Sequence, residues 1–202
     1  MHHVDPELVR PAARLLAIVE AAAARLEQRR DEIDALNVYP VPDGDTGSNM
    51  SLTMRGAIAA GRRAVAEDEG MAEVAAAMAR GALLEARGNS GVILSQWLAG
   101  MAEQAADEST LDGVVLARAL ANGQRMAYRA VLAPQEGTML SVARGAAEAA
   151  ASAARLPAEE TLAAALVGAR EALRRTPEQL EVLRRAGVVD AGGQGLVRLL
   201  EG

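Results

Sequence analysis

The chain has 202 residues, half of them hydrophobic, and a formal net charge of −6. This length is sufficient for one domain with a buried core. The acidic balance argues against nucleic acid as a partner, because binding to phosphate backbones needs a basic surface. There is no cysteine, which excludes disulfides, zinc–thiolate sites and thiol catalysis. Lysine is also absent, so that any phosphate chemistry must proceed without a P-loop lysine.

Alanine, leucine and arginine dominate the sequence and favour helix throughout. The first expected helix follows Asp5, an N-cap acid before a proline, and it has one apolar face as far as Arg30. Asp31 is expected to cap a short helical turn. The segment NVYPVPDGDTGSNM (37–50) then interrupts the helices, because its two prolines forbid regular helix and favour extended backbone in the residues before them.

Helix resumes near Ser48 and recurs along the rest of the chain, with no alternating strand pattern between the helices. The further helices are expected at about 71–86, 90–106, 111–131, 138–155, 158–174, 177–186 and after Asp190. The sequence therefore predicts an all-α fold. No apolar run is long enough for a transmembrane segment and the start lacks a signal-peptide core, so a cytoplasmic location is expected.

Three breaks between the expected helices are polar and rich in glycine. They read ARGNSGVILSQ (86–96), PQEGTMLS (134–141) and GVVDAGGQGL (187–196). In an antiparallel array of helices, alternate loops share one end. We therefore expect these loops to converge with the 37–50 segment on one site.

The DGD triplet has the composition of a cation site. In extended backbone, Asp43 and Asp45 would point the same way, and a hard divalent cation such as Mg²⁺ relieves the repulsion between two carboxylates. Thr46, Ser48 and Asn49 follow at the mouth of a helix, where free amides attract an anion. Cation and anion sites side by side are what a metal-bound polyphosphate requires.

The alternative is an acid-rich turn that only caps the following helix, and on turn-residue frequencies the two interpretations are about equal. A calcium-binding EF-hand is excluded, because its glycine and glutamate positions hold Ser48 and Met54. An aspartic-protease interpretation of DTG needs a β-rich fold, which the helical pattern does not predict.

The motifs ALNVYPVPDGDTGSNMSLTM, ARGNSGVILSQ, EGTML and GVVDAGGQGL occur in this order along nearly the whole chain. Together they resemble the ATP-binding, DhaL-type domain of the dihydroxyacetone kinase family, and most closely the amino-terminal domain of bacterial fatty acid kinases. The resemblance implies an antiparallel barrel of about eight helices with the nucleotide at one end. It also implies ATP or ADP with two Mg²⁺ ions, and a single domain over 1–202 that forms the amino-terminal part of a longer kinase.

The resemblance assigns metal ligation to Asp43 and Asp45, and it places Asn37 where dihydroxyacetone kinases carry a third aspartate. Asn37 would then contribute a carbonyl oxygen, whereas its alternative role is that of a helix C-cap. The resemblance further implies nucleotide contacts from all four motifs, through Thr46, Ser48, Asn49, Asn89, Ser90, Gly91, Thr138, Met139, Asp190, Gly192 and Gly193.

Several of these residues have a purely structural alternative. The motif at Asn89 could be a capped helix start with a tight turn. Met139 would offer an apolar surface to adenine or ribose, but a buried methionine is more often core packing. The glycines after Asp190 would permit close approach to the nucleotide, while Asp190 itself could simply cap the last helix.

No residue of the chain is a convincing general base, since His2 and His3 lie at the extreme start. The resemblance implies that the phosphoryl acceptor is held elsewhere, by further domains and a separate fatty-acid-binding protein. Three hypotheses follow: the ATP-binding part of a kinase acting on fatty acid carboxylates, a dihydroxyacetone kinase subunit or nucleotide-binding regulatory module, and a helical scaffold without ligand.

Overall fold

The computed structural model describes residues 11–105 and 111–202, and within these ranges it contains eleven helices and no strand. Eight helices have eleven or more residues: α1 (Pro11–Glu27), α3 (Thr46–Ala66), α4 (Met71–Glu85), α5 (Gly88–Ala105), α6 (Gly113–Arg129), α7 (Met139–Ala153), α8 (Ala158–Arg174) and α11 (Ala191–Glu201). Three are short: α2 (Arg30–Ala35), α9 (Thr176–Gln179) and α10 (Glu181–Ala186). The all-α prediction is confirmed.

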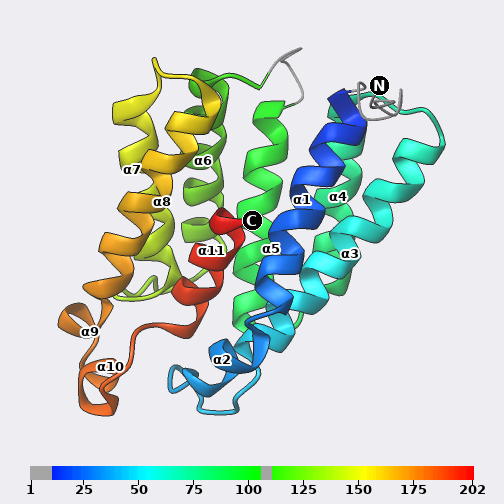
Figure 1. Cartoon of the computed structure of the whole chain (residues 1–202). Coiled ribbons are helices and arrows are strands. Elements are labelled where there is room, and N and C mark those ends of the chain that lie inside the picture. Colours follow the sequence, from blue (N-terminus) through cyan, green and yellow to red (C-terminus); the bar gives the residue numbers. More distant parts are fainter. Residues whose placement is uncertain (1–10, 106–110) are drawn as a thin grey trace, which may run out of the picture.

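The eight long helices form a closed antiparallel barrel (Figure 1). Each packs against the next long helix along the chain, from α3 to α8, and α11 closes the ring between α8 and α1. The helix start expected at Asp5, like His2 and His3, lies outside the described residues. The barrel of about eight helices that the sequence implied is therefore present, with three short helices added at its loop end.

Small residues allow neighbouring helices to approach closely in a chain without phenylalanine. A Cβ atom added to Gly56 of α3 would collide with the carbonyl oxygen of Gly81 in α4, and the reverse also holds. The space inside the barrel is filled by aliphatic side chains that are almost completely buried, among them Leu26, Ile33, Met50, Leu94, Leu140 and Leu196.

Two details differ from the sequence prediction. The expected helix at 177–186 is split at Leu180, whose backbone is extended (φ −128°, ψ 109°), into α9 and α10. Asp31 does not cap α2, which begins one residue earlier at Arg30 without a side-chain cap. Instead, the exposed Asp31 lies inside the first turn of α2, and its carboxylate forms an ion pair with the Arg30 guanidinium at 2.9 Å.

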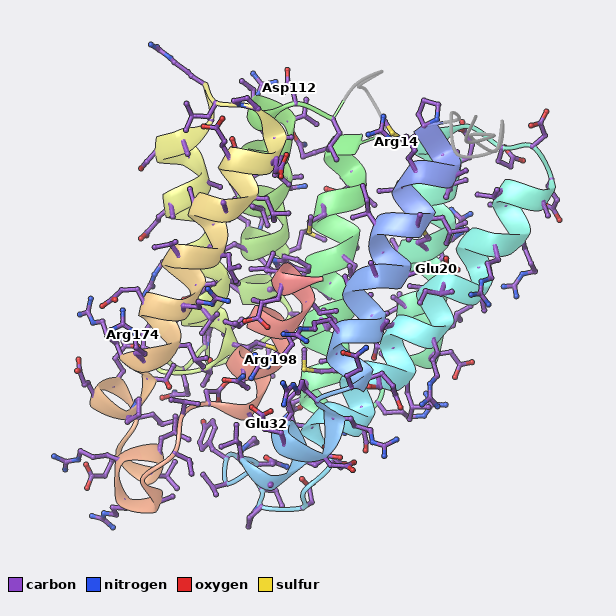
Figure 2. All side chains as sticks on the ribbon, viewed as in Figure 1. Arg14, Glu20, Glu32, Asp112, Arg174 and Arg198 are labelled. Atoms are coloured by element: carbon purple, nitrogen blue, oxygen red, sulfur yellow. The ribbon has the colours of Figure 1, made fainter. Side chains whose placement is uncertain are left out.

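Ion pairs hold the last helix against the first part of the chain. Arg198 of α11 donates to Glu32 of α2 at 2.9 Å (Figure 2). Glu201, near the end of α11, lies within 3.5 Å of Arg25 of α1 and 2.8 Å of Arg170 of α8. None of the described helices is long and apolar enough to cross a membrane.

Candidate functional site

All four polar segments of the sequence lie at the same end of the barrel, where α3, α5, α7 and α11 begin (Figure 1). The predicted convergence is therefore confirmed. Since the first amides of a helix have no partner within the helix, four helix N-termini at one end make this end electropositive at the backbone. The acidic loop between α2 and α3 stands beside them.

The DGD loop turns more sharply than the sequence suggested. Gly44 has a left-handed backbone (φ 67°) and Asp45 has φ −125° and ψ 5°, so the extended geometry expected for this triplet is wrong. Glycine adopts positive φ at no steric cost, which explains the turn. Asp45 occupies the N-cap position of α3, yet its side chain makes no capping hydrogen bond. Its carboxylate therefore makes no hydrogen bond to the amides of α3.

Asn37 is bound to this loop. Its Nδ2 donates to Asp43 Oδ1 at 2.6 Å, and the residue is only 7% exposed. Its Oδ1 is buried and has no hydrogen-bond partner. The C-cap of α2 is Leu36, and Asn37 lacks the left-handed conformation of a C-cap asparagine. Asn37 is therefore not the C-cap residue of α2, although its amide donates to the Asp34 carbonyl oxygen of this helix at 3.2 Å.

The donor set fits a hard cation. Asp45 is free of the helix, Asp43 is exposed and held by Asn37, and a buried amide oxygen without a partner is a ligand that Mg²⁺ or Ca²⁺ accepts. No cluster of three or more His, Cys, Asp or Glu side chains able to hold a metal occurs in the described parts of the chain. A cation at this loop would therefore need the Asn37 oxygen, backbone oxygens or phosphate oxygens beside the two carboxylates.

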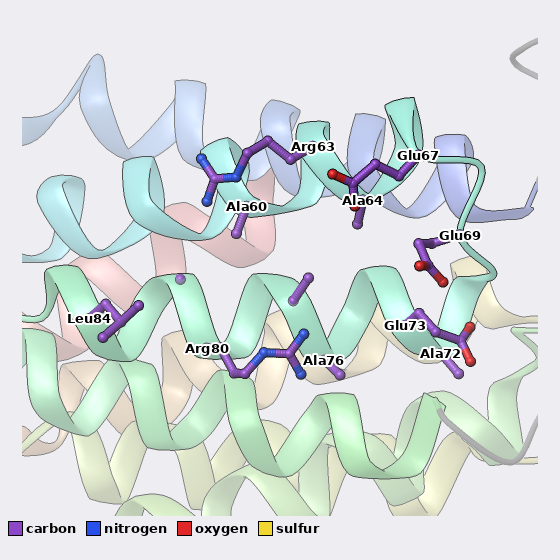
Figure 3. Close-up of a pocket in the computed structure, with 12 residues that line it drawn as sticks. Ala60, Arg63, Ala64, Glu67, Glu69, Ala72, Glu73, Ala76, Arg80 and Leu84 are labelled. Atoms are coloured by element: carbon purple, nitrogen blue, oxygen red, sulfur yellow. The ribbon is translucent and has the colours of Figure 1, made fainter.

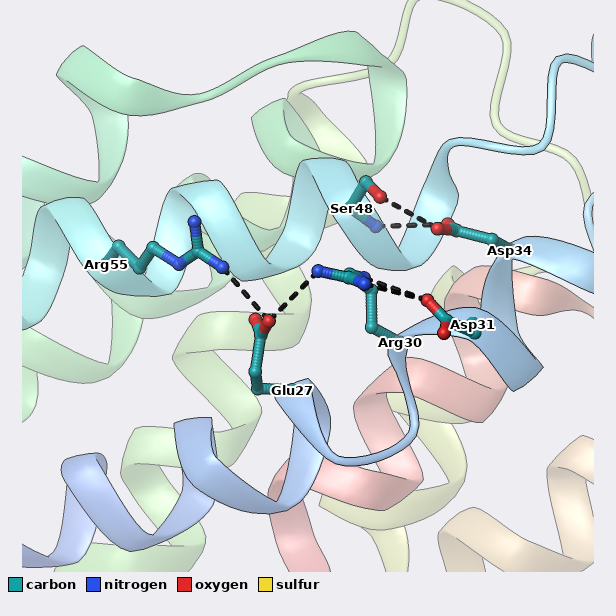
Figure 4. A network of polar contacts seen from close by, with 6 residues as sticks. All are labelled: Glu27, Arg30, Asp31, Asp34, Ser48 and Arg55. Carbon is teal, nitrogen blue, oxygen red and sulfur yellow. Dashed lines mark hydrogen bonds and ion pairs between the residues drawn. The ribbon is translucent and has the colours of Figure 1, made fainter.

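The N-terminus of α3 is capped by a residue that the sequence analysis missed. Ser48 donates to Asp34 twice, from its amide to Oδ1 at 3.0 Å and from its hydroxyl to Oδ2 at 2.7 Å (Figure 4). The amide and the hydroxyl of Ser48, which was predicted to contact phosphate, are thus both bound to the Asp34 carboxylate in this structure. Because the pair is fourteen residues apart, no local capping pattern signals it.

The start of α5 packs directly on the start of α3. A Cβ atom on Gly88, which has φ 59°, would lie 2.5 Å from Asn49 Nδ2, and one on Gly91 would lie 2.7 Å from Thr53 Oγ1. The Ser90 hydroxyl lies 3.5 Å from the Thr46 carbonyl oxygen. Asn89 is exposed in the first turn of α5. The structure therefore brings the second predicted motif to the first, and it gives Gly91 a packing role.

The third and fourth motifs form a second group. Thr138 is the N-cap of α7 and accepts from the Leu140 amide at 3.4 Å. Met139 is 4% exposed and packs against Gly192, so its side chain belongs to the core and presents no open surface. Gly193 faces Val142 in the same way. These glycines, expected to permit close approach of a nucleotide, permit close packing of α11 on α7 in this structure.

Asp190 joins these two helices. Its buried carboxylate caps α11 by accepting from the Gly193 amide at 2.7 Å, and it also interacts with the Met139 backbone of α7. Burial raises the pKa of this carboxyl to about 6, and the two backbone hydrogen bonds only partly oppose that effect. Asp190 therefore has the capping role that the sequence left open. The first turn of α11 also meets the first group, since Gly195 packs against Met50 of α3.

The raised pKa predicts a pH dependence of stability. In the folded state Asp190 binds its proton up to about pH 6, but in the unfolded chain only up to about pH 4. Its contribution to stability therefore falls as pH rises through this window, by about 3 kcal/mol at most. Asp190→Asn keeps a capping oxygen and does not titrate. Urea unfolding from pH 4 to 7 should show wild type losing stability relative to the variant. A constant difference would contradict the assignment.

Glu136 is a second residue that sequence patterns did not indicate. Its carboxylate receives both Arg144 nitrogens at 2.8 and 2.7 Å and the Ser141 hydroxyl at 2.6 Å. Tyr128 of α6 donates to it at 3.1 Å. The Arg144 guanidinium, with these hydroxyls, lowers the pKa of Glu136. The loop that carries Thr138 is therefore held between α6 and α7.

A groove of about 630 Å³ lies elsewhere, between α3 and α4 (Figure 3). Its walls carry alanines and both signs of charge, for example Arg63 and Glu73, and it follows the half of α3 remote from the DGD loop. It contains none of the predicted site residues. We therefore place the candidate site at the converging loops, where the chemistry is concentrated.

The fold and this end of the barrel define an all-α domain with an acidic loop facing several helix N-termini. The sequence profile of the DAK2 domain matches residues 40–202, and the chain belongs to the DAK2 domain family. This confirms the DhaL-type resemblance.

The chain is also similar to two curated relatives and, in its fold, to solved structures. Uncharacterized proteins of Staphylococcus aureus strains bovine RF122 / ET3-1 and USA300 are 44% identical over 184 residues. The match covers 89% of this chain and 33% of each relative, so the chain spans about a third of their length. The dihydroxyacetone kinase of C. freundii matches all of this chain with 36% of its own, at TM-score 0.67 and 21% identity in its native form, and 0.71 and 20% in complex with AMP-PNP and Mg²⁺.

Proposed function

We propose that this chain is the ATP- and Mg²⁺-binding domain of a kinase that transfers the γ-phosphoryl group. The observation that carries the proposal is the pairing of two carboxylates free of helix capping with four helix N-termini at one end of the barrel. Helix N-termini favour phosphate, and carboxylates favour the cation that accompanies it. The DAK2 family and the likeness to a kinase structure with AMP-PNP and Mg²⁺ support it.

The predicted residues other than Ser48, which is bound to Asp34, and Gly91, which packs on Thr53, have a direct role in this proposal. Asp43, Asp45 and the oxygen of Asn37 would hold Mg²⁺, whose charge would offset that of the phosphates. Thr46 and Asn49 at the start of α3, with Asn89 and Ser90 at the start of α5, would orient phosphate oxygens by hydrogen bonds. Thr138, Met139, Asp190, Gly192 and Gly193 would border the nucleotide through the first turns of α7 and α11, where their packing fixes the shape of the site.

We further propose a fatty acid carboxylate as the acceptor, held by a separate fatty-acid-binding protein and by domains outside this chain, in the cytoplasm. The motif resemblance supports this choice. A dihydroxyacetone kinase subunit, which the structural likeness favours, and a regulatory nucleotide-binding module are the alternatives. Since no described residue near the loops is a convincing general base, this chain alone should hydrolyse or transfer little phosphate.

Calorimetric titration of ATP into this chain with excess Mg²⁺ tests the proposal. We expect saturable heat with one nucleotide per chain and a higher melting temperature, because a ligand that binds only the folded state stabilises it. Val167, exposed on α8 away from the loops, supplies a control in Val167→Ala, which should bind equally. No heat and no thermal shift would favour the scaffold hypothesis instead.

A further inference from the structure

We propose that Asp34 is a positioning residue that keeps the Asp45 carboxylate available for Mg²⁺. This inference rests on the proposed function. An aspartate at the N-cap of a helix normally accepts a hydrogen bond from the amide of the second or third helical residue. At α3 the third residue is Ser48, and its amide is already bound to Asp34 at 3.0 Å (Figure 4).

Two other helices of the same chain show what an N-cap aspartate does without such a competitor. Asp112 accepts from the third amide of α6, that of Val115, at 2.8 Å. Asp190 accepts from the third amide of α11, that of Gly193, at 2.7 Å. Asp45 holds the equivalent position at α3 but makes no side-chain cap. The Ser48 amide is bound to Asp34 instead, which also accepts the Ser48 hydroxyl at 2.7 Å. The Asp45 backbone (φ −125°, ψ 5°) accordingly lacks the extended conformation that Asp112 and Asp190 adopt at their caps.

Short helix α2 is fixed so that Asp34 stays at this position. Ile33 is completely buried, and a Cβ atom on Gly47 would lie 2.5 Å from the Arg30 carbonyl oxygen, so α2 contacts the first turn of α3. Glu27 accepts from Arg30 at 3.1 Å and from Arg55 of α3 at 3.0 Å (Figure 4). Together these contacts hold α2, and with it the Asp34 carboxylate, against the first turn of α3.

The arrangement has a consequence for the proposed metal loop. If Asp34 is removed, the Ser48 amide loses its acceptor, and we expect Asp45 at the N-cap to turn and accept it, as Asp112 and Asp190 do at their helices. Mg²⁺ must then compete with a helix cap for this carboxylate. A cap of ordinary strength would weaken Mg²⁺-dependent nucleotide binding about fivefold, the factor that corresponds to about 1 kcal/mol.

The test compares Asp34→Ala with Asp112→Ala by calorimetric titration of ADP in the presence of Mg²⁺. Both variants lose a carboxylate that caps a helix, and Asp112 lies at the opposite end of the barrel (Figure 2). We expect similar losses of melting temperature but about fivefold weaker binding only in Asp34→Ala. Asp34→Asn keeps an acceptor for the Ser48 amide and should retain wild-type affinity.

A double variant isolates the mechanism. In an Asp45→Ala background, adding Asp34→Ala should cause no further loss of affinity, because the carboxylate being protected is gone. Equal affinity of Asp34→Ala and Asp112→Ala, or a full fivefold loss in the Asp45→Ala background, would overturn the inference. If Asp34→Ala does not fold, Asp34→Ser, whose side chain is shorter, replaces it. Absence of Mg²⁺-dependent ADP binding by wild type would instead refute the proposed function.

Discussion

Asp45→Ala is expected to lose Mg²⁺-dependent ATP binding by about a hundredfold or more while the helices remain formed. The reason is that the Asp45 carboxylate makes no capping hydrogen bond to α3 and no ion pair with residues 11–105 or 111–202, so its loss should remove a metal ligand without removing a structural contact. Relief of repulsion in the acidic loop should leave stability unchanged or slightly higher. Calorimetry with Mg·ATP and circular dichroism on the same sample measure both quantities.

Asp43→Ala should show the same loss of binding with a different effect on stability. Asp43 accepts the 2.6 Å hydrogen bond from the buried Asn37 amide, and a buried donor left unpaired costs about 1–3 kcal/mol. The two variants therefore share one functional effect and differ in stability. Unfolding of Asp45→Ala with unchanged affinity in the folded fraction would make Asp45 a structural residue and would contradict the metal site.

The sequence predicted the helices because their signals were periodic and local, whereas the barrel arrangement was implied by the family resemblance. Apolar faces, short polar breaks and the absence of strand patterns placed each long helix within a few residues, from α3 onward. Because these signals are local, they did not predict the break between α9 and α10 at Leu180. A loop contact made far along the chain holds this region, since Gly137 packs against Leu180 and the Thr176 carbonyl oxygen.

The candidate site was predictable as a set of motifs but not as a set of contacts. Residue types indicated that the DGD loop, ARGNSG, EGTM and the segment after Asp190 carry the chemistry. The hydrogen bonds between side chains and their partners depend on how the elements pack: Asp34 accepts from Ser48, and Glu136 accepts from Tyr128. Such partners cannot be read from spacing, because the helices that carry them meet only in the folded barrel.

The absence of lysine makes the metal the expected source of positive charge beside the phosphates. Helix amides supply only partial charges, and the acidic loop repels a nucleotide that arrives without a cation. Mg²⁺ should therefore raise ATP affinity on the order of a thousandfold, which corresponds to about 4 kcal/mol. In a P-loop protein a lysine supplies part of this charge, so a smaller dependence on metal is expected there.

Titration of ATP into metal-stripped protein with chelator, and then with excess Mg²⁺, measures this dependence. Asp45→Ala serves as the matched control, because the two conditions should differ far less once a metal ligand is missing. Equal affinity for wild type in both conditions would mean that phosphate is held by the helix amides alone. The two carboxylates around Gly44 would then have no part in binding, and their position beside four helix N-termini would need a different explanation.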